Sequence, residues 1–74
     1  MNADQFQGSW KQLRGKVREK WGQLTNDDVD VIDGKVDQLV GRIQEKYGMA
    51  RDAAQREVDR WLMQDDLLEE PGVS

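Results

Sequence analysis

Apolar residues recur along the chain at the spacing of an amphipathic α-helix, in which residues three or four positions apart share one face. The first run of this kind comprises Phe6, Trp10, Leu13, Val17, Trp21 and Leu24. A second run comprises Val36, Leu39, Val40, Ile43 and Tyr47, and a third comprises Ala50, Ala54, Val58, Trp61 and Leu62. The pattern predicts three helices that each bury one side. The three tryptophans fall within these apolar faces and are expected to fill the core.

A short helix is predicted between the first two runs. Thr25 is a favourable N-cap, because its hydroxyl can accept a hydrogen bond from an exposed N–H of the first turn. Asp27 and Asp28 follow it, where the helix dipole favours negative charge. We expect this helix to stop near Gly34.

The chain contains an internal repeat. When it is aligned with itself at a shift of 26, residues 8–22 (GSWKQLRGKVREKWG) lie over residues 34–48 (GKVDQLVGRIQEKYG), with seven of fifteen positions identical. Both copies end in glycine, and we expect Gly22 and Gly48 to terminate their helices. The repeat predicts an all-α fold of four short helices, arranged as two helical hairpins that pack on each other.

The helical domain is expected to span residues 1–63. Residues 64–74 (QDDLLEEPGVS) carry four acidic side chains and no basic one, and they contain a Pro-Gly pair. This composition predicts an acidic, flexible C-terminal tail. Leu67 and Leu68 leave open an extension of the last helix.

Glycines inside the predicted helices are unusual. Gly15 and Gly41 lie nearly opposite the apolar faces, at a cost of about 0.8–1.0 kcal/mol each relative to alanine. Two explanations remain open at this stage. Another backbone could approach closely at these positions, or the helices could have low intrinsic stability that suits a protein responding to hydration.

The residue types exclude most catalytic chemistry. The chain has no Cys and no His, which removes thiol chemistry, the usual zinc ligands and the commonest general base at neutral pH. No phosphate-binding glycine motif occurs, and the spacing of Asp27, Asp30 and Asp33 is not that of a calcium loop. We therefore predict no enzymatic activity, no metal and no cofactor.

The chain is expected to be cytoplasmic and monomeric. Its first residues contain no apolar run typical of a signal peptide, and no stretch approaches the roughly 20 apolar residues of a membrane span. The repeat makes a domain-swapped dimer a lesser alternative.

A basic face is predicted on the first helix. Residues 8–24 have a net charge of +4, although the whole chain has −4. Lys11, Arg14 and Arg18 form one stripe beside Trp21, which suggests nucleic-acid binding through phosphate contacts and base stacking. A simpler interpretation is that these cations pair with the aspartates of the next helix. The acidity of the chain favours this second interpretation. Release of this helix onto a membrane surface is a third alternative.

The motifs WKQLRGKVREKWGQLT, NDD and LVGRIQEKYG together resemble the CsbD-like family of small bacterial general stress-response proteins. The resemblance covers about residues 2–62. It implies a bundle of two roughly orthogonal helical hairpins, similar to the SAM-domain class, and induction under general stress. It implies no catalytic residues.

The sequence as a whole therefore predicts a non-enzymatic stress-response protein. We expect it to act by contacts with an unknown protein partner or as a hydrophilic protectant. The alternative is a nucleic-acid-binding module that uses Lys11, Arg14, Arg18 and Trp21.

Overall fold

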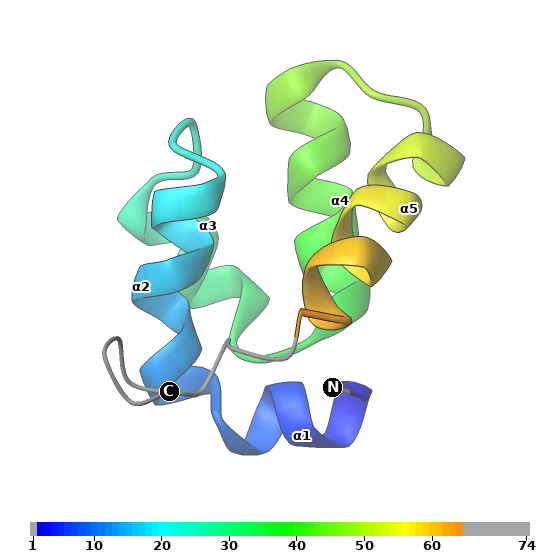
Figure 1. The fold of residues 1–74 in the computed structure, drawn as a ribbon. Coiled ribbons are helices and arrows are strands. Elements are labelled where there is room, and N and C mark those ends of the chain that lie inside the picture. The colour runs from blue at the N-terminus through cyan, green and yellow to red at the C-terminus, as the bar shows by residue number, and fades with distance from the viewer. Residues whose placement is uncertain (1, 65–74) are drawn as a thin grey trace.

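A computed structural model describes residues 2–64 of the chain (Figure 1). This part contains five α-helices and no strand: α1 (Ala3–Gly8), α2 (Trp10–Lys20), α3 (Asn26–Ile32), α4 (Val36–Tyr47) and α5 (Arg51–Leu62). The predicted all-α class is confirmed. The predicted tail lies outside the described residues, apart from Gln64. None of the helices within residues 2–64 is long and apolar enough to cross a membrane.

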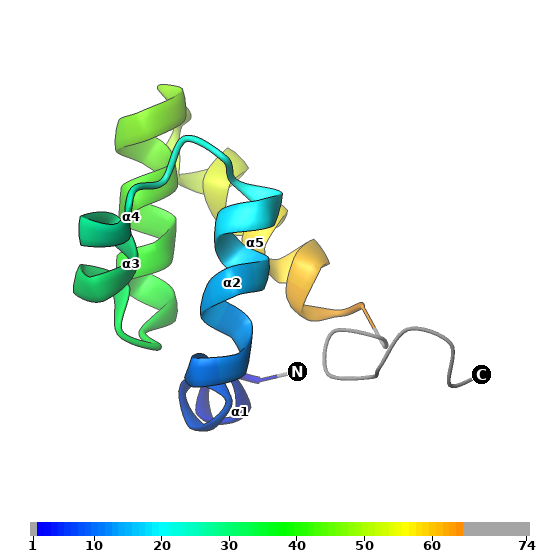
Figure 2. The ribbon, with the colours of Figure 1, turned by 90° about the vertical axis from the view of Figure 1, so that its left-hand side faces the viewer.

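The predicted first helix is divided in two, which makes five helices instead of four. Ser9 is the C-cap of α1 and the N-cap of α2, and α1 turns sharply away from α2 there (Figures 1 and 2). Gly8 precedes the break, and glycine is a poor helix former. The break leaves the apolar face intact, because Phe6 and Trp10 still pack together with ring centroids 5.3 Å apart.

The helix ends follow the prediction in part. Thr25 caps α3 through a capping box with Asp28, and Gly48 ends α4 in the left-handed conformation with φ 64°, both as expected. Gly22 directly follows Trp21, the C-cap of α2, as expected for a helix-ending glycine, but it does not have the positive φ of a left-handed cap. Trp21 is the C-cap of α2, with a backbone that is neither helical nor extended (φ −116°, ψ 81°), and its side chain is buried in the core.

The helices surround one small core. α4 and α5 run in opposite directions, α3 packs against α4 and α2, and α1 crosses the lower end of the bundle (Figures 1 and 2). All three tryptophans are buried, as predicted. Trp10 and Trp61 each contact the ring of Phe6, and Trp61 also contacts Trp21, in edge or tilted arrangements. The remaining core consists of aliphatic side chains: Leu13, Val17, Leu24, Val29, Ile32, Leu39, Val40, Ile43, Ala54, Val58 and Leu62.

The glycines differ in what surrounds them. A Cβ atom on Gly15 or Gly41 would meet nothing within 4 Å in the described part, so no helix there approaches them closely. Gly34 is the tight position, with φ 80° and a Cβ site only 3.1 Å from the Cα of Gln7 and 3.2 Å from the Cβ of Trp10. Close approach therefore occurs at the turn between α3 and α4, where α1 and α2 abut it.

We expect Gly15→Ala and Gly41→Ala each to stabilise the protein. Both sites have space for a methyl group, so each change should recover about 0.8–1.0 kcal/mol of helix propensity. For a domain of this size the melting temperature should rise by about 4–8 °C per kcal/mol. Thermal unfolding followed by circular dichroism measures the shift.

Gly34→Ala is the matched control for this experiment. It adds the same methyl group at a positive φ and against Gln7 and Trp10, so the melting temperature should fall. A fall for Gly15→Ala or Gly41→Ala would show that those two positions have a close contact that residues 2–64 do not supply.

Candidate functional site

The predicted basic face lies on α2, where it borders α3. Nη2 of Arg14 is 3.0 Å from Oδ1 of Asp30, and Nη1 of Arg18 donates to Oδ1 of Asn26 at 2.6 Å. Lys11 makes no ion pair with any described residue. The structure therefore brings two of the three cations into contacts that join α2 to α3, and the pairing of Arg14 with an aspartate of α3 follows the simpler interpretation.

Trp21 does not lie on the surface beside these cations. Its side chain is 3% exposed and packs edge-on against Trp61, with ring centroids 5.3 Å apart. Its indole N–H is buried and has no hydrogen-bond partner within residues 2–64. In this conformation Trp21 offers no free ring face on which a base could stack.

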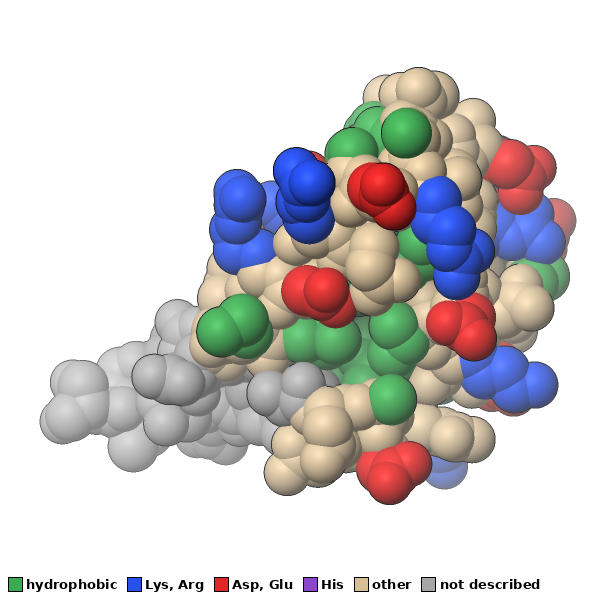
Figure 3. Space-filling view, turned by 90° about the vertical axis from the view of Figure 1, so that its right-hand side faces the viewer, with side chains coloured by type: hydrophobic (Ala, Val, Ile, Leu, Met, Phe, Trp, Pro, Cys, Tyr) green, Lys and Arg blue, Asp and Glu red, His purple; other side chains and the backbone are tan. Residues whose placement is uncertain are grey.

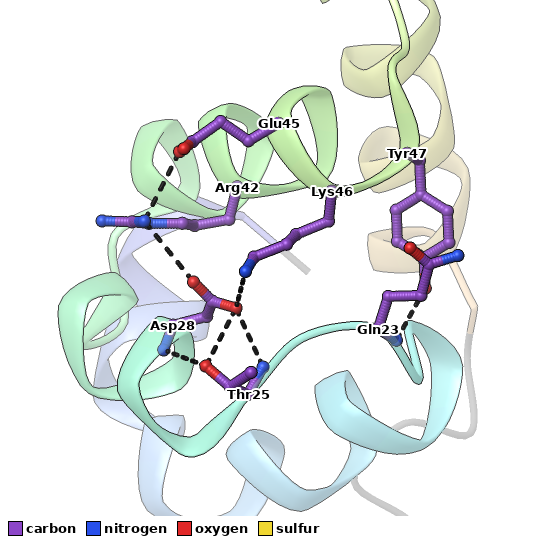
Figure 4. A network of polar contacts seen from close by, with 7 residues as sticks. All are labelled: Gln23, Thr25, Asp28, Arg42, Glu45, Lys46 and Tyr47. Atoms are coloured by element: carbon purple, nitrogen blue, oxygen red, sulfur yellow. Dashed lines mark hydrogen bonds and ion pairs between the residues drawn. The ribbon is translucent and has the colours of Figure 1, made fainter.

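A buried carboxylate organises the contact between α3 and α4. Asp28 is the one charged residue of the described part that is buried, with 4% of its surface exposed. Figure 4 shows its carboxylate between Thr25 on one side and two cations of α4 on the other. Oδ2 accepts from the Thr25 amide at 2.9 Å and lies 3.3 Å from Nζ of Lys46. Oδ1 lies 3.4 Å from Nη1 of Arg42.

The same contacts set the acidity of Asp28. The Thr25 amide, which donates to the carboxylate, lowers the pKa of Asp28 below its usual value of 3.8. Burial acts in the opposite direction, and the Thr25 hydroxyl and Lys46 lower the pKa further. A carboxylate that is so fully bonded and so acidic is a weak proton acceptor. Its chemistry suits the joining of two helices better than catalysis.

Sequence reasoning placed Asp28 in the first turn of its helix but missed its partners. The cations of α2 were expected to face it, whereas the contacts come from Arg42 and Lys46 on α4. A signal for this was present in the sequence. Arg42 and Lys46 are four residues apart and so share one helix face.

A second polar link lies beside them. The backbone N–H of Gln23 donates a hydrogen bond to the Tyr47 hydroxyl at 3.1 Å (Figure 4).

Outside the Asp28 network, the surface of residues 2–64 has an open depression but no cluster of metal-ligating side chains. Within residues 2–64 no three His, Cys, Asp or Glu side chains gather as a metal site. An open depression of about 600 Å³ lies where α1 meets α2, with Lys11 and Asp33 as its charged lining residues.

Asp28→Asn is expected to destabilise the protein by about 1.5–3 kcal/mol, because hydrogen bonds to a charged group are among the stronger ones. The change removes the charge that Arg42 and Lys46 face while keeping the side-chain size. Asp27→Asn is the matched control at an exposed neighbour, where loss of the helix-dipole interaction should cost less than about 1 kcal/mol. Urea unfolding measures both, and equal losses would contradict a special role for Asp28.

The stability should also depend on pH through Asp28. Because its folded pKa is lowered, its contribution is fully present above the unfolded value near 3.8 and is lost as the pH falls through the lower folded pKa. The difference in unfolding free energy between the natural protein and Asp28→Asn should therefore be constant at neutral pH and shrink in acid. Urea titrations from neutral pH to below pH 3 test this, and a difference that persists in acid would refute it.

The chain is similar to known proteins over most of its length. The sequence profile of the CsbD-like family matches residues 4–56. The UPF0337 protein YjbJ of Escherichia coli K12 is 57% identical over 82% of this chain and 88% of its own length. A UPF0337 protein of Pectobacterium atrosepticum is 61% identical, and one of Rhodopseudomonas palustris is 52% identical over 82% of this chain and 92% of its own.

The comparison with solved structures gives no significant match. The family profile and these relatives agree with each other, and the profile covers both copies of the internal repeat. The chain belongs to the CsbD-like family.

Proposed function

We propose that this chain is a non-enzymatic stress-response protein that acts as a hydrophilic protectant. In this role a compact, highly charged bundle accumulates among other proteins, retains water around them and keeps their surfaces apart. Membership of the CsbD-like family supports the link to stress. The distribution of apolar and charged side chains supports the mode of action.

The observation that carries the proposal is the near absence of exposed large apolar side chains. Within residues 2–64 only Val31, at 46%, and Met63, at 77%, are exposed among the large hydrophobic residues. Charged residues make up 35% of the chain. In Figure 3 acidic and basic side chains alternate over one face, and hydrophobic atoms show between them.

This surface favours a protectant over the other functions considered. A protein that holds unfolded clients needs a sizeable apolar patch, and Val31 and Met63 are the exposed large hydrophobic residues that residues 2–64 offer. Nucleic-acid binding is less well supported, because Trp21, the residue expected to stack on a base, is buried. Arg14 and Arg18, expected to contact phosphates, already bond to residues of α3. A mixed, hydrophilic surface with net charge −4 favours solubility at high concentration.

We expect the protein to preserve a desiccation-sensitive enzyme, lactate dehydrogenase, through drying and rehydration. Recovered activity should rise with the mass of added protein and exceed that with an equal mass of serum albumin. It should continue to rise beyond a one-to-one molar ratio, since no stoichiometric complex forms. The double variant Val31→Ser, Met63→Ser should protect equally well, because it removes the two exposed apolar side chains and leaves the charged surface intact.

Two results would overturn this proposal. Protection that saturates at one-to-one and is lost in the Val31→Ser, Met63→Ser variant would indicate a specific apolar contact with clients. Binding of a short DNA duplex, with an affinity that falls steeply with salt and depends on Lys11, Arg14 and Arg18, would favour the nucleic-acid module.

A further inference from the structure

The internal repeat places a pair of cations at the same positions of α2 and α4. At the shift of 26 residues, Lys16 of α2 lies over Arg42 of α4, and Lys20 lies over Lys46. The members of each pair are four residues apart and therefore share one helix face. The contacts of one pair thus indicate what the other pair is suited to bind.

The pair on α4 holds a carboxylate between its two cations. Arg42 lies 3.4 Å from Oδ1 of Asp28, and Lys46 lies 3.3 Å from Oδ2. Asp28 is the third residue of α3, and the N-cap Thr25 bonds to the same carboxylate (Figure 4). A carboxylate in the first turn of one helix is therefore bound by two cations one turn apart on the neighbouring helix.

The pair on α2 has no such partner within residues 2–64. Lys20 faces α5, which follows the second copy of the repeat as α3 follows the first. The third residue of α5 is Ala53, and its N-cap Ala50 makes no side-chain hydrogen bond. Nζ of Lys20 has a single ion pair in the described part, 3.8 Å from Oε1 of Glu57, and Lys16 has none there. The cations of the first copy are present, whereas the capped carboxylate is not.

A small groove lies beside Lys20, between α2 and α5. Its lining includes Lys20, Glu57, Arg60 and Trp61, and its volume is about 40 Å³. One water-sized group needs about 10–15 Å³, so the groove has the size of a carboxylate group. Arg60 makes no ion pair with residues 2–64, and the Glu57 side chain is 40% exposed. Two cations of the lining therefore share one half-exposed acid.

We propose that Lys16, Lys20 and Arg60 form a docking surface for an acidic segment of a partner protein. A carboxylate of that segment lies between the two lysines, as the Asp28 carboxylate lies between the two cations of α4. Charge complementarity favours this occupant, because the groove has more cations than acids. Docking is an activity in addition to the protectant action, which rests on the composition of the whole surface.

A nucleic acid is the less suitable occupant of this surface. Trp61 is the aromatic residue in the lining of the groove, and it is only 4% exposed. A base therefore finds no free ring face on which to stack. The equivalent pair of cations on α4 binds a carboxylate, which favours a protein side chain as the ligand.

Titration of the full-length protein with a short oligoglutamate peptide tests the docking surface. We expect the largest NMR shifts at the amides of Lys16 and Lys20 and at the indole N–H of Trp61. The amides of Arg42 and Lys46 should not shift, because Asp28 already occupies that pair. The titration is done at about 0.1 M salt, where the Debye length is about 10 Å and distant charges are screened.

Two double variants with the same change in net charge form the matched comparison. Lys16→Gln with Lys20→Gln should weaken binding about tenfold, because two exposed ion pairs are lost. Lys11→Gln with Lys35→Gln removes two exposed lysines that do not line the groove. This second change should leave the affinity for oligoglutamate nearly unchanged.

Removal of the acid in the groove should have the opposite effect. Glu57→Gln frees Lys20 from its present partner, so binding of oligoglutamate should become about threefold tighter. Asp37→Asn makes the same change in net charge at an exposed residue outside the groove, and it should not alter the affinity.

Three results would overturn the proposal. An absence of shifts at Lys16 and Lys20 would show that the surface does not bind carboxylates. Equal weakening by the two double lysine variants would show attraction to net charge alone. Tighter binding of a short DNA duplex than of oligoglutamate, through the same residues, would assign the surface to nucleic acid.

Discussion

The packing of four aromatic rings joins parts of the chain that have few other contacts. Phe6 of α1 packs against Trp10 of α2 and, 6.2 Å away, against Trp61 of α5, which in turn meets Trp21 at 5.3 Å. A chain of 74 residues buries a smaller share of its surface than a larger domain does, so large side chains supply much of its apolar burial. The break at Ser9 and the end of α2 before Trp21 are both compatible with this packing, because Phe6, Trp10 and Trp21 are all buried.

Charge pairing then fixes how the helices sit around that core. Asp28 bonds to the cap of its own helix and to Arg42 and Lys46 of α4, while Arg14 reaches Asp30 from α2. Exposed pairs such as Arg14 with Asp30 contribute little individually, whereas the loss of one partner from a buried pair leaves an uncompensated charge. The Asp28 network therefore defines the position of α3 on α4 more strictly than the surface pairs do.

Much of this fold could be predicted from the sequence, and the exceptions have physical reasons. Helical spacing predicted the apolar faces and the buried tryptophans. Capping preferences predicted that Thr25 begins α3 and that Gly48 ends α4. The break at Ser9 was not predicted, because Phe6 and Trp10 have the four-residue spacing of a continuous helix and remain in contact across the break. The partners of Asp28 depend on which helices become neighbours, which local spacing does not specify. Of the candidate site, the positions of the cations on α2 and the burial of Trp21 were predictable, because both follow from helical spacing.

The open glycines in the middle of α2 and α4 have a consequence for a cell that loses water. Without a side chain at Gly15 and Gly41, the neighbouring peptide groups are more accessible to solvent, which competes with the helix for their hydrogen bonds. An amide hydrogen bond contributes about 0.5–1.5 kcal/mol in water but about 4–6 kcal/mol where water is absent. Drying therefore strengthens these two helices most where they are weakest when wet. The helix stability that Gly15 and Gly41 cost in water is therefore expected to be smaller when water is withdrawn.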